Sequence, residues 1–195
     1  MRIDVYCDAS YYPKGDIATI GVVVYMDGSL QLRSGKEIPA SSNIRLCELR
    51  ALNKAIGYID TKQRTGYIPF SQTIRFHCDD LTLVEGIQKA KATLAMQNRP
   101  EKLPDYLAEN ELLYGLTMQL MRLEKNNFVT LFWISRDGNN SAHELSNEIL
   151  QEKKRQRRDH QEREAAQIVL AEKKLVNTKQ PNRRRTRRRP KGSAL

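Results

Sequence analysis

The chain of 195 residues has few cysteines, no long apolar run and no glycine-rich phosphate loop. Its three cysteines, Cys7, Cys47 and Cys78, are an odd number without metal-ligand spacing, so we expect no disulfide framework, no zinc module and a reduced, cytoplasmic compartment. No run approaches the ~18 apolar residues that span a bilayer, and the start Met-Arg-Ile-Asp-Val lacks the apolar centre of a signal peptide. We therefore expect no membrane partner, no secretion and no nucleotide cofactor.

Positive charge is concentrated near the C-terminus. Up to Leu150 there are 17 Lys and Arg against 18 Asp and Glu, whereas the remaining residues hold 16 against 5. We expect a compact domain over 1–150, a charged extension over 151–176 whose helicity the pattern leaves open, and a disordered basic arm over 177–195.

The basic arm predicts a polyanionic partner. It holds Arg183, Arg184, Arg185, Arg187, Arg188, Arg189 and Lys191. These side chains would neutralise phosphates and give sequence-independent affinity that falls with salt. Because the arm lacks aromatic residues, base stacking is not its expected mode of binding. A nuclear address, ribosome association and a solubilising tail are the alternatives to nucleic-acid attachment.

Apolar periodicity predicts three strands, a helix, a strand, two helices, a strand and a final helix. The predicted strands are residues 2–10, 17–26, 29–38, 73–78 and 128–134. The first three predicted helices are residues 41–59, 81–95 and 109–124, and Ser41 or Ser42 can cap the first of them. The last helix is expected to begin with a capping box of Ser141 and Glu144. Asp27-Gly28 predicts a tight antiparallel hairpin. The apolar run 128–134 is typical of a strand covered on both faces. This order predicts an α/β fold with a sheet that is antiparallel at first and parallel later.

Three carboxylates occupy positions that point to a shared site. Asp8 ends the first predicted strand and Asp79 follows the fourth, so their side chains would meet if these strands are parallel neighbours. Glu48 lies between Ile44 and Leu52 on the stripe of the first helix that should face the sheet. A carboxylate turned inward needs a cation or a hydrogen-bond donor, and no Lys or Arg shares this stripe.

Divalent ions would relieve the repulsion among these acids. Oxygen ligands favour magnesium or manganese, and two such ions ~3.5–4 Å apart can activate water and stabilise a leaving oxygen. Phosphodiester hydrolysis is therefore the leading chemistry. The alternatives are that Asp8 and Asp79 are ordinary turn residues, that Glu48 reaches water, and that Asp80 is the ligand rather than the cap of the next helix. The cysteine before each acid is expected to be a core residue, with the strand thiols pointing away from the carboxylates.

Residues 1–150 resemble the ribonuclease H family. The matching motifs are Asp8-Ala-Ser10, Cys47-Glu48-Leu49-Arg-Ala-Leu, Asp79 through Val84-Glu-Gly-Ile87, and Asn139-Asn-Ser-Ala-His143-Glu-Leu145. The resemblance implies a ribonuclease H-like fold, with a five-stranded mixed sheet flanked by helices, and endonucleolytic hydrolysis of the RNA strand of RNA/DNA hybrids. It also implies that Asp8 bridges two ions while Glu48 and Asp79 hold one of them.

The sequence departs from this family at three places. His143 stands where the family has a fourth acid; an imidazole can still bind a divalent ion and suits manganese, although His143 could instead only pack or cap the helix. Ile44 and Arg45 replace the asparagines that precede the helical glutamate, and the loop before the last helix offers Arg136 and Asp137 instead of a histidine.

These departures leave three functions open. The leading hypothesis is a monomeric nuclease for RNA/DNA hybrids that uses Mg²⁺ or Mn²⁺. A nuclease for branched DNA or structured RNA, and a decayed domain that only binds nucleic acid, are the alternatives. His77 and His160 carry no motif.

Overall fold

The computed structural model describes residues 1–39, 43–96 and 111–178. It consists of two compact units, residues 1–154 and 155–195. The first unit combines strands and helices, as predicted. The predicted basic arm lies almost wholly outside the described residues, as do Ser41 and Ser42.

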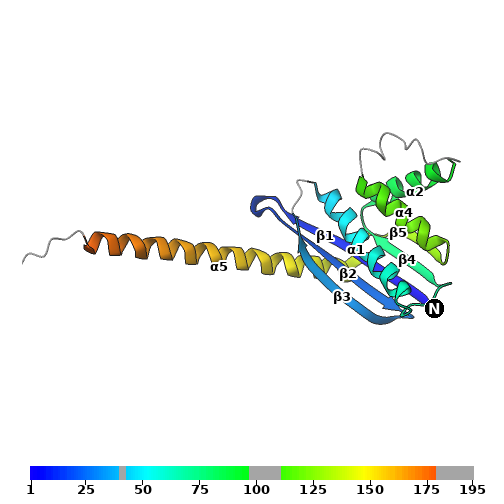
Figure 1. Ribbon diagram of the computed structural model, residues 1–195, viewed down its shortest axis with the longest axis horizontal. Helices are drawn as coiled ribbons and strands as arrows, with labels where there is room; N and C mark the ends of the chain where they lie inside the picture. The colour runs from blue at the N-terminus through cyan, green and yellow to red at the C-terminus, as the bar shows by residue number, and fades with distance from the viewer. Residues whose placement is uncertain (40–42, 97–110, 179–195) are drawn as a thin grey trace, which may run out of the picture. The chain divides into compact units, whose positions relative to one another are not determined.

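The first unit contains one five-stranded sheet (Figure 1). Its strands are β1 (Arg2–Tyr12), β2 (Ile17–Met26), β3 (Ser29–Ile38), β4 (Thr73–Cys78) and β5 (Phe128–Trp133), in the spatial order β3-β2-β1-β4-β5. β1, β2 and β3 are antiparallel, whereas β4 is parallel to β1 and β5 is parallel to β4. The predicted mixed sheet is therefore confirmed, and β1 and β4 are neighbours.

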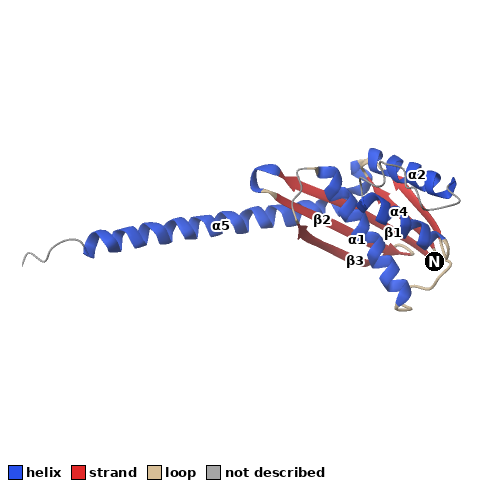
Figure 2. Cartoon of the chain, turned by 45° about the horizontal axis from the view of Figure 1, so that its top comes forward, coloured by secondary structure: helices blue, strands red, loops and turns tan. Residues whose placement is uncertain are grey.

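The helices of the structure are α1 (Ile44–Arg64), α2 (Leu81–Met96), α4 (Glu111–Glu124) and α5 (Asn140–Thr178). α1, α2 and α4 lie on one face of the sheet (Figure 2). Their apolar side chains meet alternate residues of the strands, such as Val5 of β1 and Phe76 of β4, in one buried core. This packing fixes the direction in which β1 and β4 present their remaining side chains.

The start of α5 packs on β2 and β3 through two glycines. A Cβ atom built on Gly21 would lie 2.5 Å from the carbonyl oxygen of Ala142, and one built on Gly35 would also meet α5. At Gly21 a side chain would enter the space of the helix backbone, whereas at Gly35 it would meet the side chains of Ile149 and Leu145 and the backbone oxygen of Ile20. The contact brings the first turns of α5 close to β1, the neighbour of β2.

Two predicted helix starts differ from the structure. α1 begins after Asn43, whose side-chain oxygen accepts a hydrogen bond of 2.9 Å from the backbone N–H of Arg45. α5 begins at Asn140, directly after a 3₁₀ turn over Arg136–Asn139, so the predicted capping box is wrong: Ser141 lies inside the helix. Glu144 instead accepts a hydrogen bond of 2.9 Å from the side chain of Asn140.

The prediction that β5 is covered on both faces is wrong. β5 is an edge strand, and Phe128, Phe132 and Trp133 are 75%, 40% and 48% exposed. An apolar run shows that a segment is hydrophobic, but the order of strands in space decides whether it is covered.

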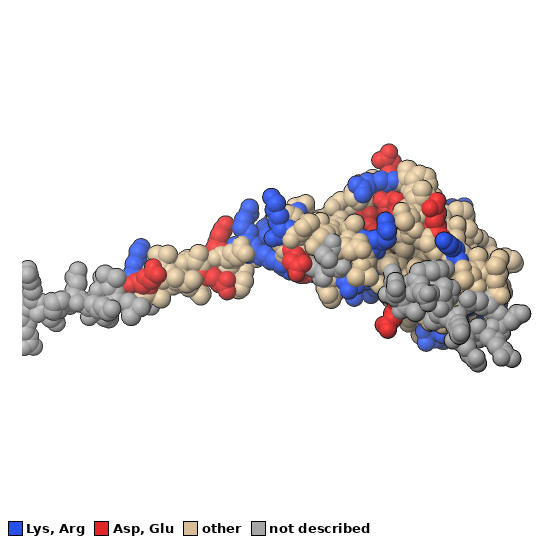
Figure 3. All heavy atoms as spheres, turned by 90° about the horizontal axis from the view of Figure 1, so that it is seen from above, with Lys and Arg blue, Asp and Glu red and all other residues tan. Residues whose placement is uncertain are grey.

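The second unit begins within α5, which continues through the charged extension to Thr178. Residues 151–176 are thus helical, and the side chains of Arg155, Arg157 and Arg158 are exposed. On the face of the first unit shown in Figure 3, acidic and basic side chains are interspersed, which agrees with its nearly balanced charge. No helix within the described ranges is both long and apolar enough to cross a membrane.

Candidate functional site

Asp8 lies in β1 beside the beginning of α5. It pairs in register with Gly21 and is 1% exposed. The Ser146 hydroxyl donates a hydrogen bond to Asp8 Oδ2, and Nδ1 of His143 lies 3.3 Å from the same oxygen. Burial and the charge of Asp79 raise the pKa of Asp8, although these two hydrogen bonds act in the opposite direction.

Glu48 is on the buried face of α1 and is 7% exposed. Its Oε2 atom has no hydrogen-bond partner among the described residues. Burial raises the pKa of Glu48 well above its usual range, and the charges of Asp8 and Asp79 raise it further. The backbone N–H of Ala9 donates to this carboxyl group and partly compensates. Glu48 is therefore a buried acid whose carboxyl group is stabilised by few of the surrounding groups.

Asp79 completes the group of carboxylates. One ligand atom each from Glu48, Cys78 and Asp79 lies within 4.8 Å of the other two. Because Asp8 and Asp79 both act on the pKa of Glu48, the three predicted acids are electrostatic neighbours. Nε of Arg136 lies 3.5 Å from Asp79 Oδ2.

Asp80, the alternative ligand, has a different role. Its Oδ1 atom accepts a hydrogen bond of 3.0 Å from the backbone N–H of Leu83, which caps the start of α2. Its other carboxylate oxygen lies 3.7 Å from Nε of Arg45. Asp80 is thus engaged in the helix cap, whereas its neighbour Asp79 belongs to the acidic group.

Cys78 differs from the expectation that its thiol points away from the carboxylates. Its Sγ atom belongs to the group with Glu48 and Asp79. The alternation along β4 does place Cys78 on the core side, but α1 packs on that same side and carries Glu48. The two side chains therefore meet at the end of β4.

His143 and three residues that the sequence analysis missed form a hydrogen-bonded chain at Asp8. The Asn147 amide nitrogen lies 2.9 Å from His143 Nε2, and the Ser10 hydroxyl donates to the Asn147 oxygen at 2.9 Å. Because the amide nitrogen is a donor, Nε2 accepts and Nδ1 carries the proton that His143 shares with Asp8. Ser146 and Asn147 follow His143 by three and four residues, so helical spacing could have indicated them.

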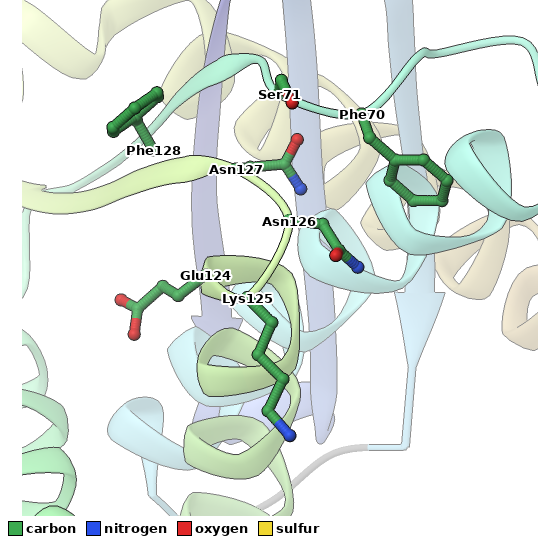
Figure 4. Close-up of a pocket in the computed structure, with 7 residues that line it drawn as sticks. All are labelled: Phe70, Ser71, Glu124, Lys125, Asn126, Asn127 and Phe128. Atoms are coloured by element: carbon green, nitrogen blue, oxygen red, sulfur yellow. The ribbon is translucent and has the colours of Figure 1, made fainter.

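A hollow of about 400 Å³ lies at the other end of β4 and β5 and is lined by Phe70, Lys125 and Phe128 among others (Figure 4). Its carboxylate, Glu124, forms an ion pair with Lys91. The six residues of β4 separate this end of the sheet from Asp79 by roughly 20 Å. The hollow lacks convergent acids and is distinct from the carboxylate site.

The sequence and the structure of this chain were compared with those of known proteins. No family model and no curated protein matches the sequence. Among solved structures, RNase H1 from the halophilic archaeon Halobacterium salinarum NRC-1 is 19% identical, with 78% of this chain and 99% of that chain covered and a TM-score of 0.53. LC11-RNase H1 in complex with RNA/DNA hybrid is 21% identical, with 77% and 98% covered and a TM-score of 0.56.

A third solved structure, the N-terminal RNase H domain of rv2228c from Mycobacterium tuberculosis, is 18% identical, with 80% of this chain and 97% of that chain covered and a TM-score of 0.53. In this chain the strand order β3-β2-β1-β4-β5 makes β1 and β4 parallel neighbours, and this pairing brings Asp8 and Asp79 together. The described structure therefore has the ribonuclease H fold.

Proposed function

We propose that this protein is a divalent-metal-dependent endoribonuclease that hydrolyses the RNA strand of RNA/DNA hybrids. The observation that carries the proposal is the unpartnered Oε2 atom of Glu48, buried among the charges of Asp8 and Asp79. Such a group is tolerable when a cation joins it, and its oxygen donors suit Mg²⁺ or Mn²⁺. The hybrid bound to LC11-RNase H1, a protein of the same fold, supports this choice of substrate.

Asp8, Glu48 and Asp79 would hold two ions. When bound, the ions would activate a water and stabilise the leaving oxygen of the phosphodiester. The protein positions each ligand differently. The Ser146 hydroxyl orients Asp8, the backbone N–H of Ala9 holds Glu48, and Asp79 follows directly on a strand that is paired on both sides. Each carboxylate is thus held by a rigid element before any ion binds.

His143 is the proposed fourth ligand. To bind an ion it must exchange the hydrogen bond with Asn147 or with Asp8 for a metal bond. Because the neutral imidazole lacks the charge of a carboxylate, we expect cleavage to be faster with Mn²⁺ than with Mg²⁺.

A second candidate function is nucleic-acid binding without cleavage. It is favoured by the engagement of both ring nitrogens of His143, which leaves the site with three carboxylates in this arrangement. A nuclease for branched DNA or structured RNA requires the same carboxylates and differs only in substrate.

The basic arm, Arg183 to Lys191, is proposed to attach the protein to phosphates. Exposed Arg155 and Arg158 at the beginning of the second unit would extend this attachment. Such contacts carry no sequence information, so the arm would raise affinity for any nucleic acid.

Asp79→Asn tests the proposed function. The variant should cut labelled hybrid at least about 100-fold more slowly than the wild type, because it removes one charge from the ligand set. Asp16→Asn is the matched control: Asp16 is exposed and has a left-handed φ of 48°, which asparagine also adopts, so this variant should keep the full rate. Duplex DNA, branched DNA, duplex RNA and structured RNA are assayed in parallel with each metal.

Thermal unfolding of both variants shows whether the fold is intact. A full cleavage rate for folded Asp79→Asn would remove Asp79 from the site. If wild-type protein cuts none of the substrates with either metal and still shifts hybrid in a gel, the second candidate function is correct.

A further inference from the structure

The thiol of Cys78 lies among the buried carboxylates but has no part in the proposed hydrolysis. Its Sγ atom is within 4.8 Å of an oxygen of Glu48 and of an oxygen of Asp79. Cys78 is fully buried, and Glu48 brings to the same place an oxygen without a hydrogen-bond partner among the described residues. The site therefore offers one soft donor beside two hard ones.

We propose that Cys78, Glu48 and Asp79 form a binding site for a thiophilic divalent ion such as Zn²⁺ or Cd²⁺. The inference rests on the carboxylate site of the proposed function, but it does not require cleavage. Binding breaks the S–H bond of Cys78, the proton leaves to solvent, and the sulfur electron pair forms the metal–sulfur bond.

The geometry suits a tetrahedral ion. Zinc bonds of about 2.3 Å to sulfur and about 2.0–2.2 Å to oxygen place ligand atoms roughly 3.3–3.8 Å apart. The observed limit of 4.8 Å on each separation means that no pair of ligand atoms has to approach by more than about 1.5 Å. Asp79 is partly exposed, so the fourth ligand can be water.

Of the other two cysteines, Cys47 is the control, whereas the thiol of Cys7 is hydrogen-bonded to that of Cys78. Cys7 and Cys47 are also fully buried, and each directly precedes a predicted site acid. Cys7 donates a weak hydrogen bond to the carbonyl oxygen of His77 at 3.6 Å. Within the part of the chain that the structure describes, Cys78 is the cysteine whose sulfur belongs to the group.

A thiophilic ion at this site would exclude the ions proposed for hydrolysis. Glu48 and Asp79 cannot complete a zinc site and at the same time hold Mg²⁺ in the geometry that it demands. Zn²⁺ would bind tightly through sulfur, whereas Mg²⁺ gains little from a thiolate. The site would thus make the nuclease sensitive to traces of soft metals.

Cadmium provides a direct test, because a cadmium–thiolate bond absorbs in the ultraviolet and a cadmium–carboxylate bond does not. The full chain, reduced with a phosphine, is titrated with Cd²⁺. We expect a band of one-thiolate intensity that saturates at one equivalent. Cys78→Ser should lose the band, whereas Cys47→Ser should keep it.

Glu48→Gln supplies a second measurement that keeps all three thiols. It should retain the band but weaken Cd²⁺ binding at least tenfold, because it removes a charged ligand. Thermal unfolding confirms that each variant is folded. The proposal is overturned if folded wild type gives no band, if the band persists in Cys78→Ser, or if Glu48→Gln binds Cd²⁺ as tightly as the wild type.

The outcome separates this inference from the proposed function. Cleavage of hybrid without a thiolate band would leave the nuclease and overturn the thiophilic site. A band that depends on Cys78 and Glu48, in a protein that cuts no substrate, would support the thiophilic site and overturn the nuclease.

Discussion

Replacing Gly21 by alanine tests whether the start of α5 lies where Asp8 needs it. The added Cβ would lie 2.5 Å from the Ala142 carbonyl oxygen and 3.0 Å from the Ser146 nitrogen. A carbon and a carbonyl oxygen normally approach to about 3.3–3.6 Å, so the helix must move by about 1 Å. Both atoms belong to the backbone, so no side-chain rotation can relieve the contact.

This movement should cost about 1–3 kcal/mol, as for other overpacked interiors. It should also lengthen the 3.3 Å contact between His143 and Asp8 beyond hydrogen-bonding distance. We therefore expect Gly21→Ala to lower the thermal midpoint by about 2–4 °C for each kcal/mol lost, and to slow cleavage of hybrid.

Gly57→Ala is the matched control, measured by the same urea and thermal denaturation. Gly57 lies in α1, and a Cβ there would meet no described atom within 4 Å, so alanine should stabilise the protein by about 0.5–1 kcal/mol. If Gly21→Ala were as stable and as active as the wild type, the close packing of α5 on β2 and its support of Asp8 would be refuted.

Two further predictions concern charge. Burial raises the pKa of Asp4, but hydrogen bonds from Arg2, His77 and Arg75 outweigh it and hold this pKa below its usual range. Asp4→Asn should therefore cost about 1–3 kcal/mol at pH 7, and the difference in denaturation from the wild type should vanish as the pH falls below about 4; a difference independent of pH would contradict this. Replacing the seven basic residues of 183–191 by glutamine should reduce the slope of the logarithm of the hybrid-binding constant against the logarithm of salt concentration by up to about 6. The cleavage rate at saturating hybrid should stay the same. An unchanged slope would exclude the arm from binding.

Local sequence patterns are sufficient to predict much of the fold. β2, β3 and β4 have the predicted bounds because alternation and the Asp27-Gly28 turn are properties of short segments. Asp8 and Asp79 lie close together because β1 and β4 are parallel neighbours. The prediction that Asp8 ends its strand is wrong, because β1 continues past it to Tyr12. The exposure of Phe132 could not be predicted in this way, because an edge position depends on strand order.

The finer structure of the site also depends on tertiary packing. His143 reaches Asp8 only because α5 approaches β1, and Gly21 permits that approach. The thiol of Cys78 meets Glu48 only because α1 and β4 share one face of the core. Neither contact has a signal within a short stretch of sequence.

Among the described strands, β5 forms one edge of the sheet, and this position bears on how copies of the protein would behave in solution. Natural sheets commonly block such an edge with lysine, proline or a bulge, whereas Phe128–Trp133 contains neither residue, and its pairing with β4 has no register shift. Repulsion between copies from the net charge of +10, nearly all of it on residues after Leu150, would oppose the pairing of two such edges. Added salt screens that repulsion, so the conditions expected to weaken the proposed binding of nucleic acid by the basic arm would also favour strand-to-strand aggregation.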